Sequence, residues 1–400
     1  MKTLSIIIVL QFFLCCNYLS YSQWVQTNNP FGTNVVRLAV NEPNIIAGTN
    51  NGGAFLTTDN GTDWSHIGLD SSVIYALAVS GANVFAGTNK GVSLTTNNGS
   101  TWTIINNGLP GNKFVYNLAV SGINIYAGTD KGVCLTVNNG TNWNQINNGL
   151  IASNISSIAA SGNNIFAGSA NKIYRSTNSG SNWTQLNNTI TSPFVDALIV
   201  SGTNVYAGTD GSGVYLSTDN GTTWAQANNS LPDNSHVHTF ILNGTNVFAG
   251  TDNGVYLSMD NGLSWIQAGL PSFSVYSLVI RQTNIYAGTS GAGVWKRPLS
   301  EFTGISNEIK DLPKDYTLSQ NYPNPFNPNT IISYSLPSAF NIRLNIYNTL
   351  GQKIKTLETG YKTAGNYSVN FNASDLPSGI YFYKLEAGQF TQTKKMILIK

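Results

Sequence analysis

The chain has little charge and almost no cysteine. Asp, Glu, Lys and Arg make up 10% of its 400 residues, against about 25% in an ordinary soluble protein. Its three cysteines are Cys15, Cys16 and Cys134, too few for a disulfide framework. Asn, Gly, Ser and Thr abound instead. This composition is typical of a turn-rich, all-β extracellular protein whose stability comes from packing.

Long apolar runs are also missing, apart from one at the N-terminus. There, Lys2 precedes the mostly apolar residues 4–14, a run too short for a stable membrane span but long enough for the core of a signal peptide. We therefore predict that residues 1–22 are a cleaved signal peptide. Lipidation at Cys15 or Cys16 is the alternative, and the bulky residues just before them argue against it. No later run predicts a transmembrane anchor.

A unit of about forty residues recurs through residues 23–299. A full unit contains three strand patterns, as in residues 75–79, 83–88 and 91–95, and a fourth that starts at a tryptophan such as Trp102. Four short strands per unit predict a seven-bladed β-propeller, whereas a stacked solenoid would need distinct capping repeats. The triplet Ala-Gly-Thr, once Ala-Gly-Ser, starts at Ala47, Ala86, Ala127, Ala167, Ala207, Ala249 and Ala287.

The two ends of the repeat predict closure into a ring. The seventh unit stops after its third strand, near Trp295, and has no tryptophan-led fourth strand. Residues 24–29, Trp-Val-Gln-Thr-Asn-Asn, match residues 224–229, Trp-Ala-Gln-Ala-Asn-Asn. We therefore expect the strand at Trp24 to complete the last blade, which leaves the ring without an unpaired edge.

A recurring turn joins the third and fourth strands of six units. In the first unit it reads Thr-Thr-Asp-Asn-Gly-Thr-Asp-Trp over residues 57–64. The turns resemble the Asp-box, or BNR, turns of sialidases, sortilin-type receptors and several polysaccharide-acting propellers. Their side-chain oxygen can accept backbone N–H bonds, the glycine tolerates positive φ, and the tryptophan packs into the blade. The predicted structural residues are Asp59, Asn97, Asn138, Asn178, Asp219 and Asp260.

A different pattern follows the repeat. The polar residues 300–317 predict a linker, and residues 318–400 contain short strands with turn signals, which predict a small Ig-like β-sandwich. This segment opens with Asn-Tyr-Pro-Asn-Pro-Phe-Asn-Pro at 321–328, contains Gly-Ile-Tyr at 379–381 and closes with Lys-Lys-Met-Ile-Leu-Ile-Lys. It closely resembles the type A C-terminal sorting domain of the type IX secretion system of Bacteroidetes-like bacteria.

That resemblance implies a partner and a location. The outer-membrane machinery of type IX secretion would recognise residues 318–400 and usually remove them, and the protein would be secreted or held on the outer cell surface. Charge agrees with this division: residues 23–299 hold nine Lys/Arg and eleven Asp/Glu, whereas residues 318–400 hold eight and three. An ordinary adhesion module with a basic surface is the alternative, and it leaves the Pro-Asn-Pro-Phe opening unexplained.

The propeller lacks the residues of a sialidase. The resemblance to sialidase turns implies several arginines, a Tyr/Glu pair and an Arg-Ile-Pro motif. Residues 23–299 contain four arginines, the single glutamate Glu42 and no such motif. Sialidase activity is therefore not expected.

Other glycoside hydrolases use two carboxylates that flank the scissile bond. Asp70, Asp196 and Asp233 remain as candidates, although none has a visible partner. Asp130, Asp210 and Asp252 follow the Ala-Gly-Thr triplet, and we interpret them as turn residues.

Metal binding finds little support in the sequence. His236 and His238 are two residues apart on a predicted strand, so they can face the same way. A catalytic zinc site needs three protein ligands, and the only other histidine is His66. We therefore interpret the pair as polar strand residues at a loop mouth and predict no metal and no cofactor. Cys134 falls in an apolar column and is predicted to be a buried small hydrophobe.

One column of the repeat is variable and polar. It lies near the start of the predicted innermost strand, where loops converge at the mouth of the channel. Three tyrosines, an aspartate and a histidine there are able to stack on and hydrogen-bond a sugar or peptide, although tyrosines that merely pack between blades are the alternative. The candidate ligand-binding residues are Tyr75, Tyr116, Asp196, His238 and Tyr276, and Val36 and Ser156 complete the column.

The sequence thus predicts an exported propeller that binds an unidentified extracellular glycan or protein. A secreted polysaccharide hydrolase or lyase is the alternative, and a surface spacer without a ligand is a third possibility. Nucleic acid is not an expected partner, because the propeller is slightly acidic and its basic residues are scattered.

Overall fold

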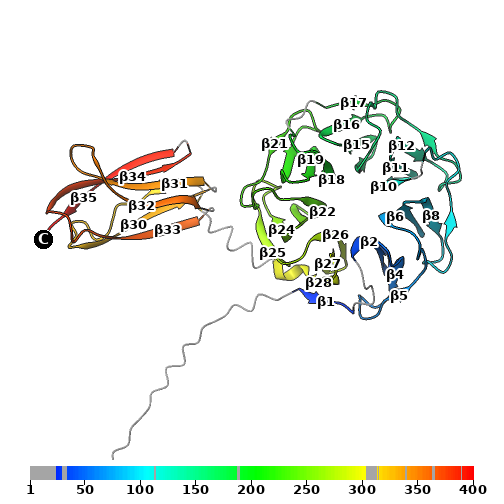
Figure 1. Ribbon diagram of the computed structural model, residues 1–400, viewed down its shortest axis with the longest axis horizontal. Coiled ribbons are helices and arrows are strands. Elements are labelled where there is room, and N and C mark those ends of the chain that lie inside the picture. Colours follow the sequence, from blue (N-terminus) through cyan, green and yellow to red (C-terminus); the bar gives the residue numbers. More distant parts are fainter. Residues whose placement is uncertain are drawn as a thin grey trace, which may run out of the picture.

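The computed structural model describes residues 24–28, 34–111, 114–186, 190–302, 313, 315–337, 340–362, 365–388 and 390–400. The predicted signal peptide and most of the predicted linker lie outside these ranges. The described residues are all-β apart from one 3-10 turn, η1 (Leu299–Phe302), and none of their helices can span a membrane. Figure 1 shows a ring of blades and a C-terminal sandwich, which confirms the predicted fold class.

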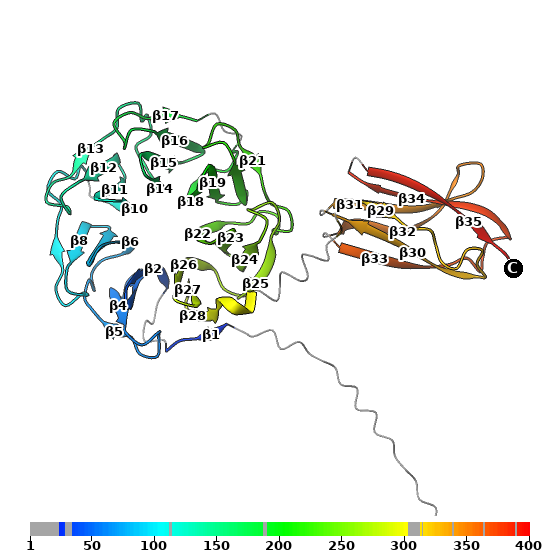
Figure 2. The ribbon, with the colours of Figure 1, turned by 180° about the vertical axis from the view of Figure 1, so that it is seen from behind.

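The ring consists of seven antiparallel four-stranded sheets. Figure 2 shows the ring from behind, with one strand of each sheet next to the central axis. These innermost strands are β2 (Val35–Asn41), β6 (Ile74–Ser80), β10 (Val115–Ser121), β14 (Ser157–Ser161), β18 (Val195–Ser201), β22 (Val237–Asn243) and β26 (Val275–Arg281). The second strands are β3 (Asn44–Thr49), β7 (Asn83–Thr88), β11 (Asn124–Thr129), β15 (Asn164–Ser169), β19 (Asn204–Thr209), β23 (Asn246–Thr251) and β27 (Asn284–Thr289).

The outer half of each sheet is shorter. The third strands are β4 (Ala54–Thr57), β8 (Gly91–Thr95), β12 (Gly132–Thr136), β16 (Lys172–Ser176), β20 (Val214–Ser217), β24 (Gly254–Ser258) and β28 (Gly293–Pro298). The outermost strands are β5 (Ser65–His66), β9 (Thr103–Ile104), β13 (Asn144–Gln145), β17 (Thr184–Gln185), β21 (Ala225–Gln226), β25 (Ile266–Gly269) and β1 (Val25–Gln26).

The Ala-Gly-Thr triplet has a structural reason. It ends the second strand, which is buried on both faces because a neighbouring blade covers each of them. A Cβ atom at Gly48 would lie 2.6 Å from Cγ2 of Ile74, on the first strand of the next blade, so glycine permits this close approach. The hydroxyl of Thr49 donates to the carbonyl of Gly53 at 2.8 Å and secures the turn into the third strand.

The first and last parts of the propeller share one sheet. β1 pairs antiparallel with β28, with Val25 opposite Lys296 and Gln26 opposite Trp295. The sheet order β1-β28-β27-β26 therefore closes the ring with main-chain hydrogen bonds between segments about 270 residues apart.

The six recurring turns share one hydrogen-bond pattern. In the first, the hydroxyl of Thr57 donates to Asp59 Oδ1 at 2.8 Å, and the same oxygen accepts the N–H of Asp63 at 3.0 Å. Gly61 has a φ of 85°, and its N–H donates to the Thr57 hydroxyl. Asn97, Asn138, Asn178, Asp219 and Asp260 accept the corresponding bonds. Since these turns follow the third strand, the antiparallel order puts them at the end of the ring opposite the start of the innermost strands.

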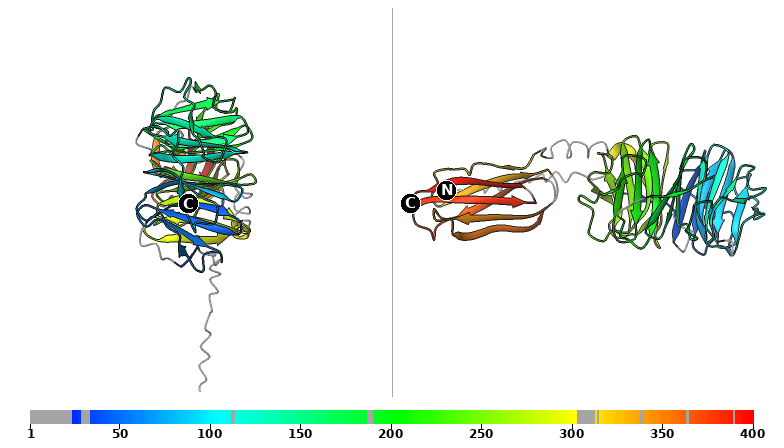
Figure 3. Two further views of the ribbon diagram at one scale, coloured as in Figure 1. Left: turned by 90° about the vertical axis from the view of Figure 1, so that its right-hand side faces the viewer. Right: turned by 90° about the horizontal axis from the view of Figure 1, so that it is seen from above.

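The C-terminal unit is a two-sheet sandwich around one apolar core (Figure 3). Tyr383 in the core joins the opening segment to the sheet, since its hydroxyl accepts the N–H of Asn321 at 2.8 Å and donates to Ser319 O at 2.7 Å. One sheet contains β29 (Thr317–Leu318), β30 (Asn329–Leu336) and β33 (Gly365–Asn372); the other contains β32 (Lys353–Lys362), β31 (Phe340–Tyr347), β34 (Gly379–Ala387) and β35 (Phe390–Leu398).

Candidate functional site

The structure gathers the variable column of the repeat around one cavity. The cavity has a volume of about 470 Å³ and lies where the innermost strands begin. All seven column residues line it and are half-buried, which leaves part of each open to the cavity. We call this cavity the channel mouth; its column residues are Val36, Tyr75, Tyr116, Ser156, Asp196, His238 and Tyr276.

One side of the channel mouth is aromatic. The rings of Tyr75 and Tyr116 have centroids 5.6 Å apart and are tilted by 53°. Phe114 lies nearly parallel to Tyr116, at 6.1 Å and 11°. Phe194, from the loop before β18, also lines the cavity and is 45% exposed. Exposed aromatic faces of this kind suit the apolar faces of a ligand.

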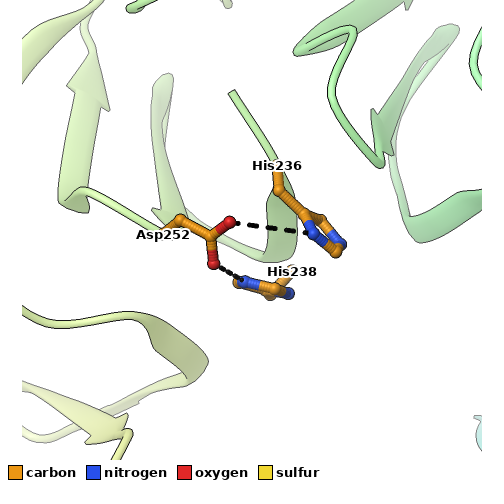
Figure 4. Close-up of side chains that lie close together, drawn as sticks. All are labelled: His236, His238 and Asp252. Atoms are coloured by element: carbon orange, nitrogen blue, oxygen red, sulfur yellow. Dashed lines mark hydrogen bonds and ion pairs between the residues drawn. The ribbon is translucent and has the colours of Figure 1, made fainter. Parts of the chain in front are cut away.

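The other side holds two histidines among aspartates. His236 and His238 have ring centroids 4.0 Å apart, and His238 also packs edge-on against Tyr276 at 4.8 Å. His238 Nε2 is 2.7 Å from Asp252 Oδ1. In Figure 4 the carboxylate of Asp252 lies beside the two imidazoles, with one oxygen directed toward each.

His236 has carboxylates at both ring nitrogens. Its Nε2 is 2.9 Å from Asp196 Oδ2, and its Nδ1 is 3.2 Å from Asp210 Oδ1 and 3.9 Å from Asp252 Oδ2. Burial lowers the pKa of His236, but the three carboxylates outweigh it and raise the pKa above the usual value. Burial, together with the charge of His236, lowers the pKa of His238. The two neighbouring imidazoles therefore differ in their affinity for a proton.

Arg37 adds a fixed positive charge. It is half-buried in the channel mouth, and its guanidinium donates to the carbonyl of Val36 at 2.7 Å and to that of Tyr276 at 3.4 Å. Burial lowers its pKa, while Asp196 opposes that shift. An arginine remains protonated in such surroundings, so the cavity contains a permanent cation near its aspartates.

Sequence reasoning missed four members of this site. It passed over Arg37, set aside His236 for lack of a third histidine, and interpreted Asp210 and Asp252 as turn residues only. Asp252 does occupy a turn, and its N–H donates to the carbonyl of His236 at 3.3 Å. The useful signal was strand pairing: Val237 opposite Thr251 puts Asp252 beside both histidines. Asp210 occupies the equivalent turn of the preceding blade, where its N–H donates to the carbonyl of Phe194 at 3.2 Å.

The three aspartates considered for hydrolysis are not brought together. Asp196 lines the channel mouth. Asp233 lines a separate cavity of about 590 Å³, beside Asn234. Asp70 is an exposed residue paired with His66 at 2.5 Å. Within the part of the chain that the structure describes, these three aspartates therefore do not share a cavity.

Two parts of the chain match known domain families. Residues 320–400 match the secretion system C-terminal sorting domain, and residues 114–233 match the DUF6242 beta propeller domain. No curated protein matches the sequence. The sorting domain indicates export by type IX secretion to the outer cell surface or the extracellular space.

Solved structures resemble the chain in fold. YCF48 bound to D1 peptide has a TM-score of 0.57 at 15% identity, over 70% of this chain and 98% of that one. PorZ, a surface component of the type IX secretion system of Porphyromonas gingivalis, has a TM-score of 0.51 at 14% identity, over 92% and 60%. A GH74 xyloglucanase from Xanthomonas campestris has a TM-score of 0.56 at 15% identity, over 78% and 59%. At such identities the likeness extends to the fold alone.

Proposed function

We propose that this chain, whose sorting domain directs it out of the cell, is a binding module that holds an extracellular ligand in the channel mouth without cleaving it. The observation that supports this is the convergence of one variable residue from each blade on a single cavity. Its volume of about 470 Å³ is in the range of sites for small molecules or chain ends. A flat protein surface would not enter it.

The lining favours a ligand with apolar faces and a polar edge. Tyr75, Tyr116 and Phe194 offer aromatic rings, while Asp196 and Arg37 offer an acceptor and a donor. The end of an oligosaccharide has both features, because its ring faces carry C–H groups and its edges carry hydroxyls. A peptide segment is the second ligand class, since the similarly folded YCF48 has been seen with a peptide bound.

Cleavage of a polysaccharide is the competing function. It needs an acid and a second carboxylate on either side of the bond. Of Asp70, Asp196 and Asp233, only Asp196 lines the channel mouth, and its carboxylate is occupied by His236. The proposal therefore assigns Asp196 to ligand binding rather than to catalysis.

The test is retention of the purified protein on immobilised polysaccharides, glycoproteins and peptides, with new reducing ends measured in parallel. We expect retention without cleavage. Tyr116→Ala and Asp196→Asn should each weaken retention by about tenfold or more, as expected for buried contacts in a binding site. Asp233→Asn is the matched control, because Asp233 lines a different cavity, and it should behave as wild type. Release of reducing ends, or retention that none of these changes affects, would overturn the proposal.

A further inference from the structure

We propose that His236, His238 and Asp252 bind a first-row divalent metal ion of the Zn²⁺ class, with Asp210 as a further oxygen ligand. This metal site requires only these side chains. It lies at the channel mouth, which His236 and His238 line, but it does not depend on whether a sugar or peptide binds there.

The ligand atoms already lie close to coordination geometry. One atom from each of His236, His238 and Asp252 can be chosen so that all three lie within 4.8 Å of one another. Zinc binds nitrogen and carboxylate oxygen at about 2.0–2.2 Å, so ligand atoms around a tetrahedral ion are about 3.4 Å apart. His236 Nδ1 is 3.2 Å from Asp210 Oδ1 and 3.9 Å from Asp252 Oδ2. Small side-chain rotations would complete the site.

The backbone keeps these groups in place. His236 precedes β22 and His238 lies on it, where the register shifts between Val237 and Thr239, and the two imidazole rings have centroids 4.0 Å apart. The pairing of Val237 with Thr251 fixes Asp252 beside them, and the N–H of Asp252 is bonded to the carbonyl of His236. A site built on paired strands changes little when an ion enters.

Asp196 acts on the site through His236. It lies 2.9 Å from Nε2 of that imidazole and leaves Nδ1 directed toward Asp210 and Asp252. A carboxylate on the far nitrogen of a ligating histidine is the usual outer support of a metal site. A neutral imidazole has a single N–H, so one that donates to Asp196 presents a bare Nδ1 lone pair to two carboxylates. Either a second proton on Nδ1 or a metal ion relieves this arrangement, and only the metal ion would also draw His238 and Asp252 together around it.

Charge and access agree with a metal ion. Asp196, Asp210 and Asp252 bring three negative charges, and Arg37 is the fixed cation that lines the cavity near them. The Asp210 and Asp252 side chains are 42% and 49% exposed, so an ion can reach the site without unfolding. Two imidazoles among the ligands favour Zn²⁺, Co²⁺ or Ni²⁺ over Ca²⁺ or Mg²⁺, which prefer oxygen alone.

The first experiment uses the unaltered protein. The chain contains three histidines, so their imidazole resonances can be told apart by NMR. Tag-free protein is stripped with EDTA and titrated with Zn²⁺. We expect the signals of His236 and His238 to shift together and saturate at one equivalent, while those of His66 stay in place. Absence of saturable shifts, or equal shifts at all three histidines, would overturn the metal site.

Variants then test each ligand by calorimetry with Zn²⁺. His238→Ala and Asp252→Asn should weaken binding by at least about tenfold, and Asp196→Asn should weaken it by about 10- to 100-fold through the imidazole. His66→Ala is the matched control, since His66 pairs with Asp70 as His238 pairs with Asp252 but has no second histidine beside it. It should bind Zn²⁺ as wild type does. Unchanged affinity in His238→Ala and Asp252→Asn would refute the assignment.

A last comparison separates this proposal from the binding function. Retention on the polysaccharide and peptide panel is measured for EDTA-stripped and Zn²⁺-loaded protein. If the protein is retained on a polymer but does not bind Zn²⁺, the metal site is refuted and the proposed binding function stands. If the protein binds Zn²⁺ saturably but is retained on no polymer, the proposed binding function is refuted and the metal site stands.

Discussion

The indole Nε1 of Trp24 donates a 2.9 Å hydrogen bond to the carbonyl of Ala268, 244 residues further along the chain. Trp24 begins the last sheet, whereas Ala268 belongs to β25 of the sheet before it. Trp143 and Trp183 make the same bond to the preceding sheet, through Ile105 O and Ile146 O at 2.7 and 2.6 Å. Trp102 and Trp265 also make this bond, so the seam of the ring is built like four of its other blade junctions.

Trp24 should contribute strongly to stability. Trp24→Ala removes a side chain that is 6% exposed, and we expect it to lower the free energy of unfolding by about 3–5 kcal/mol. Trp24→Phe keeps most of the packing and removes one of two side-chain hydrogen bonds to the Ala268 carbonyl, since Arg297 Nη1 also donates to it at 2.8 Å, so we expect a loss of about 0.5–1.5 kcal/mol. Urea unfolding measures both. Val25→Ala, at a residue 57% exposed, is the control, and a Trp24→Ala protein as stable as that control would contradict the role of this bond.

Cys134 should be inert in the folded protein. It is fully buried and unpaired, and burial raises the pKa of its thiol to about 12. Because the thiolate is the reactive form, iodoacetamide at pH 8 should leave native protein unmodified and alkylate it fully in denaturant. Mass spectrometry counts the adducts. Rapid modification of native protein would mean that β12 opens readily.

The turn at Asp219 should give a pH dependence to stability. The Thr223 N–H, at 2.8 Å, together with the hydroxyls of Thr223 and Ser217, lowers the pKa of Asp219 to about 2. Its unfolded pKa is near 3.9, so the charged form stabilises the fold above about pH 4, and this contribution is lost as pH falls toward 2.

Two substitutions separate charge from hydrogen bonding at this turn. Asp219→Asn keeps an acceptor, as Asn97 does in its own turn, so its Tm should lie slightly below wild type at pH 7 and approach it from pH 4 to pH 2. Asp219→Ala should have the lowest Tm of the three at pH 7. A gap between wild type and Asp219→Asn that does not change with pH would rule out this contribution.

Export should depend on the C-terminal unit. Deletion of residues 318–400 is expected to remove the protein from the cell surface and the medium, because the sorting domain at 320–400 would be missing. Fractionation of the producing bacterium followed by immunoblotting measures how much protein is in the cell, on its surface and in the medium. A reporter carrying residues 1–22 and 318–400 is the complementary test, and it should appear outside the cell. Surface display of the truncated chain would assign sorting to another segment.

Much of the fold follows from local features that the sequence displays directly. The Ala-Gly-Thr triplet indicates the repeat because Gly48 must admit the next blade, as its counterparts do in every unit, and Thr49 closes a turn with a hydroxyl bond that recurs in the six units with threonine. The turn of residues 57–64 depends on contacts at most four residues apart, so its residue types are readable in sequence. The Pro-Asn-Pro-Phe opening likewise identifies the sorting domain.

The channel mouth is different, because tertiary structure decides which polar groups share it. Alignment of the repeat places Tyr116, Asp196 and His238 at equivalent strand positions, and symmetry alone then brings them around one axis. That Asp252 contacts His238, and that Asp196 and Asp210 lie on opposite nitrogens of His236, depends on strand register, side-chain direction and the distance between adjacent blades. The sequence by itself determined the propeller, its closing strand pattern and its sorting domain, since periodicity and short-range bonding specify them. Only the folded ring placed Asp196 and Asp210 beside the two histidines, because those contacts cross from one blade to the next and depend on how closely adjacent blades pack.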